Sequence, residues 1–276
     1  NSKVRLAQAF TRAGRLQEAR KLLEQADRVV ANPTVKASLA NLEALESNRQ
    51  KAQALVTVLS GRDDPTIISL YEQMNPPPEV RQFGRIRDVV APALLRSRPN
   101  TQPRIVFLCG RSVEPWYTGS LEQGIGGSET AAIQVARRFA RDGWRVDVYN
   151  DPERWEGVYD GVGYWENKRL GQSEHTDLLV GWRQPEALAR GIDHRVSLLW
   201  CHDLNVGPGR GETLAQWDRV LGASGWHSRY LSRVYGLANT DYVPNGIDLS
   251  RFAEPVKKIP FRCVYASSPD RGLDRL

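Results

Sequence analysis

The chain has 276 residues, a mass of 31.0 kDa and 41% hydrophobic residues, which is too long for one ordinary core and predicts two or more domains. No run of eighteen apolar residues occurs and the charged first residues lack a signal-peptide layout, so we expect no membrane span and a cytosolic protein. The net charge is +6, and residues 1–103 carry all of the surplus, with 16 Lys and Arg against 10 Asp and Glu. A basic face there would suit an anionic membrane surface, approached from the cytoplasm, or a protein partner, although a solvated helix face is the commoner explanation.

The cysteines and histidines show no metal-binding pattern. The cysteines lie in or beside apolar, strand-like runs and form no C-x-x-C pair, which predicts buried free thiols. The histidines have no zinc-ligand spacing with each other or with the cysteines, so we expect no metal site. The cysteines are Cys109, Cys201 and Cys263, and the histidines are His175, His194, His202 and His227.

Residues 1–98 have the apolar spacing of helices and are predicted to form a separate helical domain. The segment Leu6–Leu23 resembles a tetratricopeptide repeat, with Phe10 on the first helix, Gly14 at the turn and Pro33 closing the unit. Pro65 follows Pro33 after another Ala/Leu-rich stretch, which leaves room for a degenerate second repeat. A plain helical hairpin is an equally good interpretation.

A run of three prolines at 76–78 predicts a break before the last helix of this region, because each proline fixes its own φ and restricts the residue before it. The next segment is a basic amphipathic helix, and residues 99–103 form the predicted linker. The apolar face of that helix comprises Val80, Phe83, Ile86, Val90 and Leu94, and the basic side comprises Arg81, Arg85, Arg87, Arg96 and Arg98.

Residues 104–250 alternate apolar strands with helical segments, which predicts a Rossmann-like, doubly wound parallel sheet with ligands at the carboxyl ends of its strands. The predicted strands are 104–109, 145–149, 177–180, 196–201, 219–223 and 241–243. The predicted helices are 128–140, 184–189 and 226–235.

A glycine-rich loop follows the first strand and ends at Gly126-Gly127-Ser128-Glu129, directly before a helix for which Ser128 is the predicted N-cap. Glycines let an anionic group approach the backbone, and the unpaired N–H groups of a first helical turn favour negative charge. The loop therefore predicts an anion site. A tight turn between strand and helix without a ligand is the alternative interpretation.

Two further strand ends carry polar residues. His202 and Asp203 follow a buried strand, where a histidine held by a carboxylate can position or protonate a ligand group. A structural histidine is equally compatible with this position. The string Val243–Asp248 is a strand ending in a Pro-Asn-Gly turn, which in most proteins only reverses the chain.

These three landmarks, in this order, resemble the retaining glycosyltransferases of family 4. That family has the GT-B fold, in which two Rossmann-like domains face each other across a cleft. The resemblance covers residues 104–276, and it makes residues 251–276 the start of a truncated second domain. It implies transfer of a hexose from a nucleotide-sugar donor to an acceptor hydroxyl of a glycan, lipid or protein, with retained configuration and without a metal or other cofactor.

The resemblance also implies roles for individual residues. His202, beside Asp203, would meet the transferred sugar as the catalytic pair, and Arg271 takes the place of a lysine that neutralises the diphosphate leaving group. Ser267-Ser268 stands where the family has Gly-Arg, so one phosphate-binding cation is missing. The chain ends before the family's nucleotide pocket, which implies a fragment inactive by itself. The implied donor-binding residues are Gly126, Gly127, Ser128, Glu129, Asn245, Gly246 and Arg271. Trp116 and Tyr117 could stack on an acceptor sugar, although partly buried loop aromatics are the commoner interpretation of such residues.

Two other classes remain open. Asp151 follows the second strand, where a NAD(P)-binding oxidoreductase keeps its ribose-binding acid. Against this class, Gly124 lies fourteen positions after Gly110, and the dinucleotide fingerprint is tighter. No lysine follows the glycines as a P-loop requires. A non-catalytic binding module built on the helical repeats is the other alternative. No feature indicates nucleic-acid binding.

Overall fold

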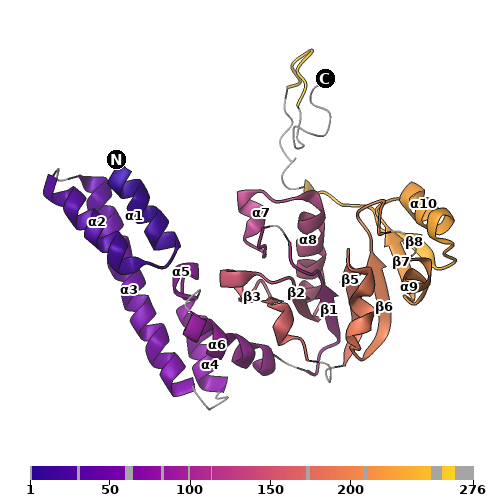
Figure 1. Ribbon diagram of the computed structural model, residues 1–276, viewed down its shortest axis with the longest axis horizontal. Helices are drawn as coiled ribbons and strands as arrows, with labels where there is room; N and C mark the ends of the chain where they lie inside the picture. Colours follow the sequence, from indigo (N-terminus) through magenta and orange to yellow (C-terminus); the bar gives the residue numbers. More distant parts are fainter. Residues whose placement is uncertain are drawn as a thin grey trace. The chain divides into compact units, whose positions relative to one another are not determined.

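The computed structural model divides the chain into two units, residues 1–244 and residues 245–276 (Figure 1). No helix within the described part of the chain is both long and apolar enough to cross a membrane. The described residues are 2–29, 32–59, 65–81, 84–98, 100–112, 114–171, 175–207, 210–249 and 257–264.

The first unit begins with an all-helical region, as the sequence predicts. Gly14 lies between the first two helices with φ +72°, which glycine adopts at little cost. The third helix runs unbroken for 27 residues. A second repeat made of two short helices would need a turn within this span, and the helix continues through it instead. The three helices are α1 (Ser2–Arg12), α2 (Leu16–Val29) and α3 (Pro33–Leu59), and their shared core includes Ala7, Leu16, Ala19, Leu23, Val35 and Leu42.

Three further helices lead to the sheet, with the proline break where it was predicted. Four of the five residues predicted for the apolar face of the basic helix are buried, but Val80 belongs to a separate short helix, so the prediction of one helix carrying them all was wrong. Phe83 lies outside the described residues. The helices are α4 (Pro65–Met74), α5 (Pro78–Arg81) and α6 (Gly84–Ser97), and the buried residues are Val80, Ile86, Val90 and Leu94.

Two arginines of the predicted basic face bind the sheet region. Arg87 forms an ion pair with Glu166 at 3.2 Å, and Arg98 forms one with Asp147 at 3.4 Å. Because ion pairing offsets these charges, these two arginines add little to an attraction for anionic partners.

An eight-stranded sheet forms the rest of the first unit, in the order β3-β4-β2-β1-β5-β6-β7-β8. β3 is antiparallel to β4, and the other neighbours are parallel. All six predicted strands are present, and the predicted Rossmann-like α/β fold is confirmed. The strands are β1 (Arg104–Leu108), β2 (Arg145–Tyr149), β3 (Gly157–Tyr159), β4 (Val162–Trp165), β5 (Thr176–Trp182), β6 (His194–Trp200), β7 (Arg219–Gly222) and β8 (Thr240–Tyr242).

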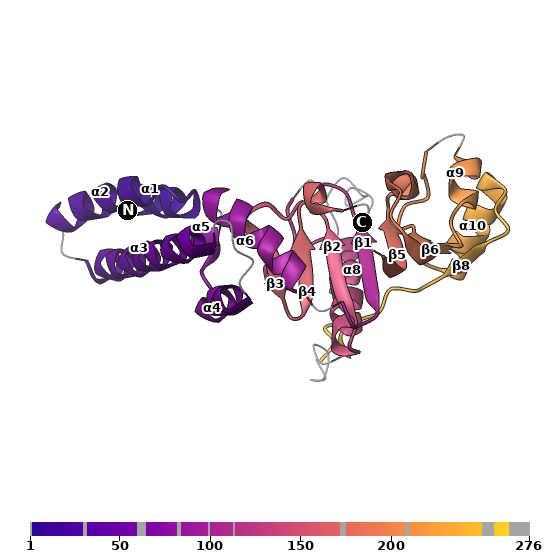
Figure 2. The ribbon, with the colours of Figure 1, turned by 90° about the horizontal axis from the view of Figure 1, so that it is seen from below.

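Helices cover both faces of the sheet (Figure 2). Alternate residues of β1 belong to two separate cores, as strand geometry requires. Ile105 and Phe107 share a core with α8, whereas Val106 and Leu108 share one with α6. The last helix of the helical region, α6, therefore also covers part of one face of the sheet. The helices that follow β1 are α7 (Ser120–Gln123), α8 (Gly127–Arg141), α9 (Gly211–Ala215) and α10 (Gly225–Tyr235), with 3-10 helices at Glu153–Trp155, Asn167–Arg169 and Pro185–Arg190.

The edge hairpin of β3 and β4 was not predicted, although the sequence carries a signal for it. Asp160 and Gly161 connect the two strands with φ values of +50° and +80°. An Asp-Gly pair with positive φ at both residues is the favoured two-residue connection between antiparallel strands. The two strands have only three and four residues, so their alternation is too short to stand out from a loop.

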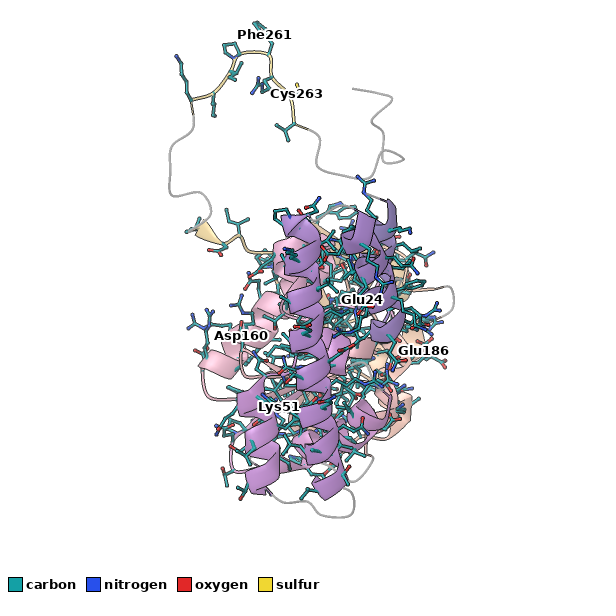
Figure 3. The ribbon with its side chains drawn as sticks, turned by 90° about the vertical axis from the view of Figure 1, so that its left-hand side faces the viewer. Glu24, Lys51, Asp160, Glu186, Phe261 and Cys263 are labelled. Atoms are coloured by element: carbon teal, nitrogen blue, oxygen red, sulfur yellow. The ribbon has the colours of Figure 1, made fainter. Side chains whose placement is uncertain are left out.

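In the second unit, the structure describes residues 245–249 and 257–264 and gives the second segment no strand. Cys263 is exposed there, as is Phe261 (Figure 3), so the prediction of a buried thiol was wrong for this cysteine. It holds for Cys109 and Cys201. Ser267, Ser268 and Arg271 lie outside the described residues.

Candidate functional site

The glycine loop begins α8 two residues earlier than the sequence suggested. Gly126 is the N-cap, with φ −55° and ψ 151°, and no side chain caps the helix. Ser128 is instead the second helical residue, and its hydroxyl donates to the Glu129 carboxylate at 2.8 Å. Prediction of Ser128 as N-cap was wrong because the preference for serine is statistical, and glycine is also accepted there.

The start of α8 faces an open hollow at the carboxyl edge of the sheet. Gly126 lines a cavity of about 520 Å³. A Cβ placed on Gly127 or on Gly124 would meet no atom within 4 Å. Close packing therefore does not require glycine at these two positions. The cavity is lined by Cys109, Arg111, Ser112, Glu114, Ile125, Gly126, Glu129, Trp182, Arg183, Gln184 and Asp203.

Arg183, which the sequence did not single out, links the two predicted motifs. Its Nε donates to the Asp203 carboxylate at 2.7 Å, and its terminal nitrogen lies 3.8 Å from the Glu129 carboxylate. Arg183 has φ +56°, an uncommon conformation for a residue with a side chain and one that clusters at functional sites. The side chains of this cavity include two arginines and three carboxylates. The side-chain charge of this lining is therefore net negative and would not by itself attract an anion.

His202 lies at the end of β6 and lines an adjoining cavity of about 310 Å³. The two cavities share Arg183, Gln184 and Asp203. Burial, and then the nearby charge of Arg183, lower the pKa of His202 to about 4, against the opposing effect of the Asp203 and Glu129 carboxylates. The imidazole is therefore neutral near pH 7 and can exchange hydrogen bonds without carrying charge.

Three nitrogen atoms around His202 are buried without a hydrogen-bond partner among the described residues. They are Nε2 of His202 and the indole nitrogens of Trp182 and Trp200. The two indole rings flank the imidazole, with ring centroids 5.9 and 4.7 Å from it. Buried polar atoms are nearly always hydrogen-bonded, so three unpaired nitrogens in neighbouring rings are unusual.

His227 holds the loop that carries Asp203. Its Nδ1 accepts a hydrogen bond from the backbone of Ala223 at 3.0 Å, so the proton resides on Nε2, which donates to the backbone carbonyl of Asp203 at 3.1 Å. Sequence reasoning gave this histidine no role. Its position in the first turn of a helix after a strand end was the available signal.

The cysteines near the site are not reactive groups. Burial raises the pKa of Cys109 and raises that of Cys201 to about 12, so both thiols stay protonated and are poor nucleophiles.

The structure separates the two predicted acceptor aromatics. Trp116 is completely buried, and its ring contacts Tyr164 and Trp182 edge-on. It therefore supports the site from within, and stacking of a ligand on this ring was a wrong prediction. Tyr117 points to a different cavity, where it stacks on Trp155.

The remaining predicted residues lie elsewhere. Asn245 and Gly246 belong to the second unit and are exposed, and Arg271 is outside the described residues. Asp151 is occupied within the first unit, since its carboxylate accepts hydrogen bonds from the backbone and side chain of Asn167 at 2.6 and 2.8 Å.

Across the described ranges, no group of three or more His, Cys, Asp and Glu residues is arranged to hold a metal ion. No protein-family model matches the chain, and a search of curated proteins found no significant match.

Proposed function

We propose that the chain is part of a retaining glycosyltransferase, in which the first unit binds the sugar end of a nucleotide-sugar and the acceptor. One observation carries the proposal: the open, uncapped start of α8 and the neutral His202 border adjoining cavities that share Arg183, Gln184 and Asp203. Together with the family resemblance of the three motifs, this arrangement suits a ligand that joins an anionic group to a polyhydroxylated one.

The backbone of α8 is suited to the diphosphate of the donor. The N–H groups of Gly127 and Ser128 belong to the first helical turn, where no carbonyl four residues back is available to accept them. The helix dipole adds to their positive potential. As the bond between sugar and diphosphate breaks, negative charge grows on the leaving oxygen, and fixed donors of this kind stabilise that charge without rearranging.

The polar side chains of the shared wall are suited to sugar hydroxyls. Glu129 and Asp203 are hydrogen-bond acceptors, and Arg183, bridging them, limits their motion. His202 offers an uncharged imidazole that lines the adjoining cavity. Such a group can hold a hydroxyl of the transferred sugar while the acceptor hydroxyl attacks the anomeric carbon.

Asn245, Gly246 and Arg271 remain predicted contacts of the donor, and the helical region remains a proposed accessory for a protein partner, the acceptor or an anionic membrane surface. The oxidoreductase alternative loses support because the Asp151 carboxylate is taken up by Asn167 instead of being open to a ribose.

Competition binding tests the proposal. Nucleoside diphosphates, their sugar conjugates and NADH are titrated calorimetrically into this chain and into the full-length protein that contains it. We expect at least one nucleotide-sugar to bind the full-length protein and its nucleoside diphosphate to displace it, with no competition from NADH. Binding of NADH together with indifference to every nucleoside diphosphate would contradict the transferase and favour the oxidoreductase.

A further inference from the structure

A second cavity, of about 730 Å³, lies in the first unit between the α4–α5 connection and the β3–β4 hairpin. Its volume is in the range of small-molecule sites. One wall consists of three half-buried aromatic rings. Tyr117 stacks on Trp155 with centroids 4.5 Å apart and an interplanar angle of 11°, and Tyr159 meets Tyr117 edge-on at 4.8 Å. The guanidinium of Arg154 also lies over the Trp155 ring, 4.9 Å from its centroid, so a ligand at Trp155 would displace this side chain.

The charged side chains of this cavity balance each other. Arg137 pairs with Asp160 at 3.0 Å. Arg81 donates to the side chains of Asn75 and Tyr159 at 2.6 and 2.9 Å, and its guanidinium lies over the Tyr159 ring. With Glu122, the lining contains two arginines and two carboxylates, and no net formal charge. A charged ligand would find no counter-charge there, whereas a neutral ligand with many hydroxyl groups would find both donors and acceptors.

We propose that this cavity binds a neutral hexose unit of a glycan. A pyranose ring has a face of C–H groups that packs against aromatic rings, and a rim of hydroxyls that pairs with planar polar side chains. Both kinds of surface occur here together. Aromatic grooves also bind proline-rich peptides, but Pro76 and Pro77 of the chain itself already line this cavity.

The cavity is connected through the chain to the candidate site. Trp116 precedes Tyr117, and its ring contacts Trp182 at 5.7 Å, beside His202. Its carbonyl accepts a hydrogen bond from the Asn150 side chain at 2.7 Å, which holds the segment in place. The proposal goes beyond the transferase and stands without it, because a glycan could bind here whether or not the chain transfers sugar.

The test follows the indole N–H signals of this chain by NMR during titration with neutral trisaccharides of glucose, mannose and galactose. The Trp155 signal is identified by its absence in Trp155→Phe. We expect at least one trisaccharide to shift it in a saturable manner. Because the Trp155 variants lack this signal, their affinity for the same trisaccharide is measured calorimetrically. Trp155→Ala should weaken that binding about tenfold, the scale of one lost aromatic stack, and Trp155→Phe should retain most of it.

Two further variants separate the cavity from general effects. Asp160→Asn removes one carboxylate, and asparagine, like aspartate, is tolerated at the positive φ of this position. This variant should weaken sugar binding several-fold, and it tests the cavity even if Trp155→Ala proves unstable. Trp226→Ala, at an exposed tryptophan on α10, should leave it unchanged. The proposal is overturned if no trisaccharide shifts Trp155, if Trp226→Ala weakens binding equally, or if a decaproline peptide shifts Trp155 and no sugar does. Nucleotide-sugar binding by the full-length protein should be the same in Trp155→Phe, so this test and that of the transferase fail separately.

Discussion

Replacing Asp147 with alanine is expected to lower the free energy of unfolding by about 3–5 kcal/mol, the usual cost of removing one partner of a buried charge cluster. The Asp147 side chain is fully buried in β2 and lies within 3.4 Å of the guanidinium nitrogens of Arg98, Arg104 and Arg145. It also accepts a hydrogen bond from the Trp165 indole at 2.9 Å. The variant would leave three largely buried cations facing one another.

The pKa of Asp147 supports this expectation. Burial acts to raise it, but Arg98, Arg104, Arg145 and the Trp165 hydrogen bond outweigh burial, and the pKa is lowered. A carboxyl group with a lowered native pKa stabilises the fold above its ordinary range and loses that effect as the pH falls through the native pKa. The contribution is therefore fully present at pH 7, where the variant is compared.

Urea denaturation at pH 7 provides the measurement, and Asp142→Ala provides the control. Asp142 is exposed and pairs with Arg138 on the surface of α8 at 2.9 Å, so its loss should cost less than about 1 kcal/mol. Asp147→Asn keeps the shape and one acceptor but removes the charge, and it should behave like Asp147→Ala. Equal stability of Asp147→Ala and Asp142→Ala would contradict a structural role for the cluster.

Replacing His202 with alanine in the full-length protein is expected to reduce kcat about a hundredfold or more, the scale of a positioned catalytic group. The lost imidazole is the neutral hydrogen-bonding group at the wall shared with Arg183 and Asp203. His202→Gln places an uncharged, hydrogen-bonding amide there and should recover part of the rate lost in His202→Ala. Rates are measured with the nucleotide-sugar that binds in the competition experiment.

The pH dependence gives a second readout for His202. Because its pKa is lowered to about 4, the ring gains a proton only as the pH falls towards 4, and it then becomes a cation beside Arg183. The wild-type rate should therefore show no loss attributable to His202 between pH 7 and 5, and the His202→Gln protein should lack the acid limb near pH 4. His175→Ala is the control, since His175 is exposed and paired with Asp193. Unchanged turnover in His202→Ala would make this histidine structural.

Much of the fold could be predicted because its strands are buried on both faces and therefore read as short apolar runs, such as residues 104–108. Apolar spacing identifies the buried face of a helix, but it does not identify the element against which that face packs. The buried stripe of α6 was evident in the sequence, but its packing against Val106 and Leu108 depends on tertiary contacts. Short elements also escaped, as the β3–β4 hairpin shows.

The candidate site was predicted only in part, for a similar reason. The glycine loop before a helix predicted Gly126, and the end of a buried strand predicted His202, but nothing in the sequence connected the two. Arg183 joins them because β5 lies beside β6 in the sheet, an adjacency that no local pattern encodes. Aromatic residue type also did not distinguish Trp116, which is fully buried, from Tyr117, which lines a cavity. Burial of a loop side chain depends on the elements that meet over it.

The central claim is that the start of α8 binds the diphosphate of a nucleotide-sugar, and Gly127→Val tests it most directly. A side chain at Gly127 meets nothing within 4 Å in the structure, so it should leave the fold intact while blocking the approach of a ligand to the backbone. Arg141→Val, at the exposed far end of the same helix, is the matched control. The account predicts that Kd for the nucleotide-sugar, measured calorimetrically in the full-length protein, rises at least about tenfold in Gly127→Val and stays unchanged in Arg141→Val. An unchanged Kd in Gly127→Val, with the melting temperature of the wild type, would contradict it.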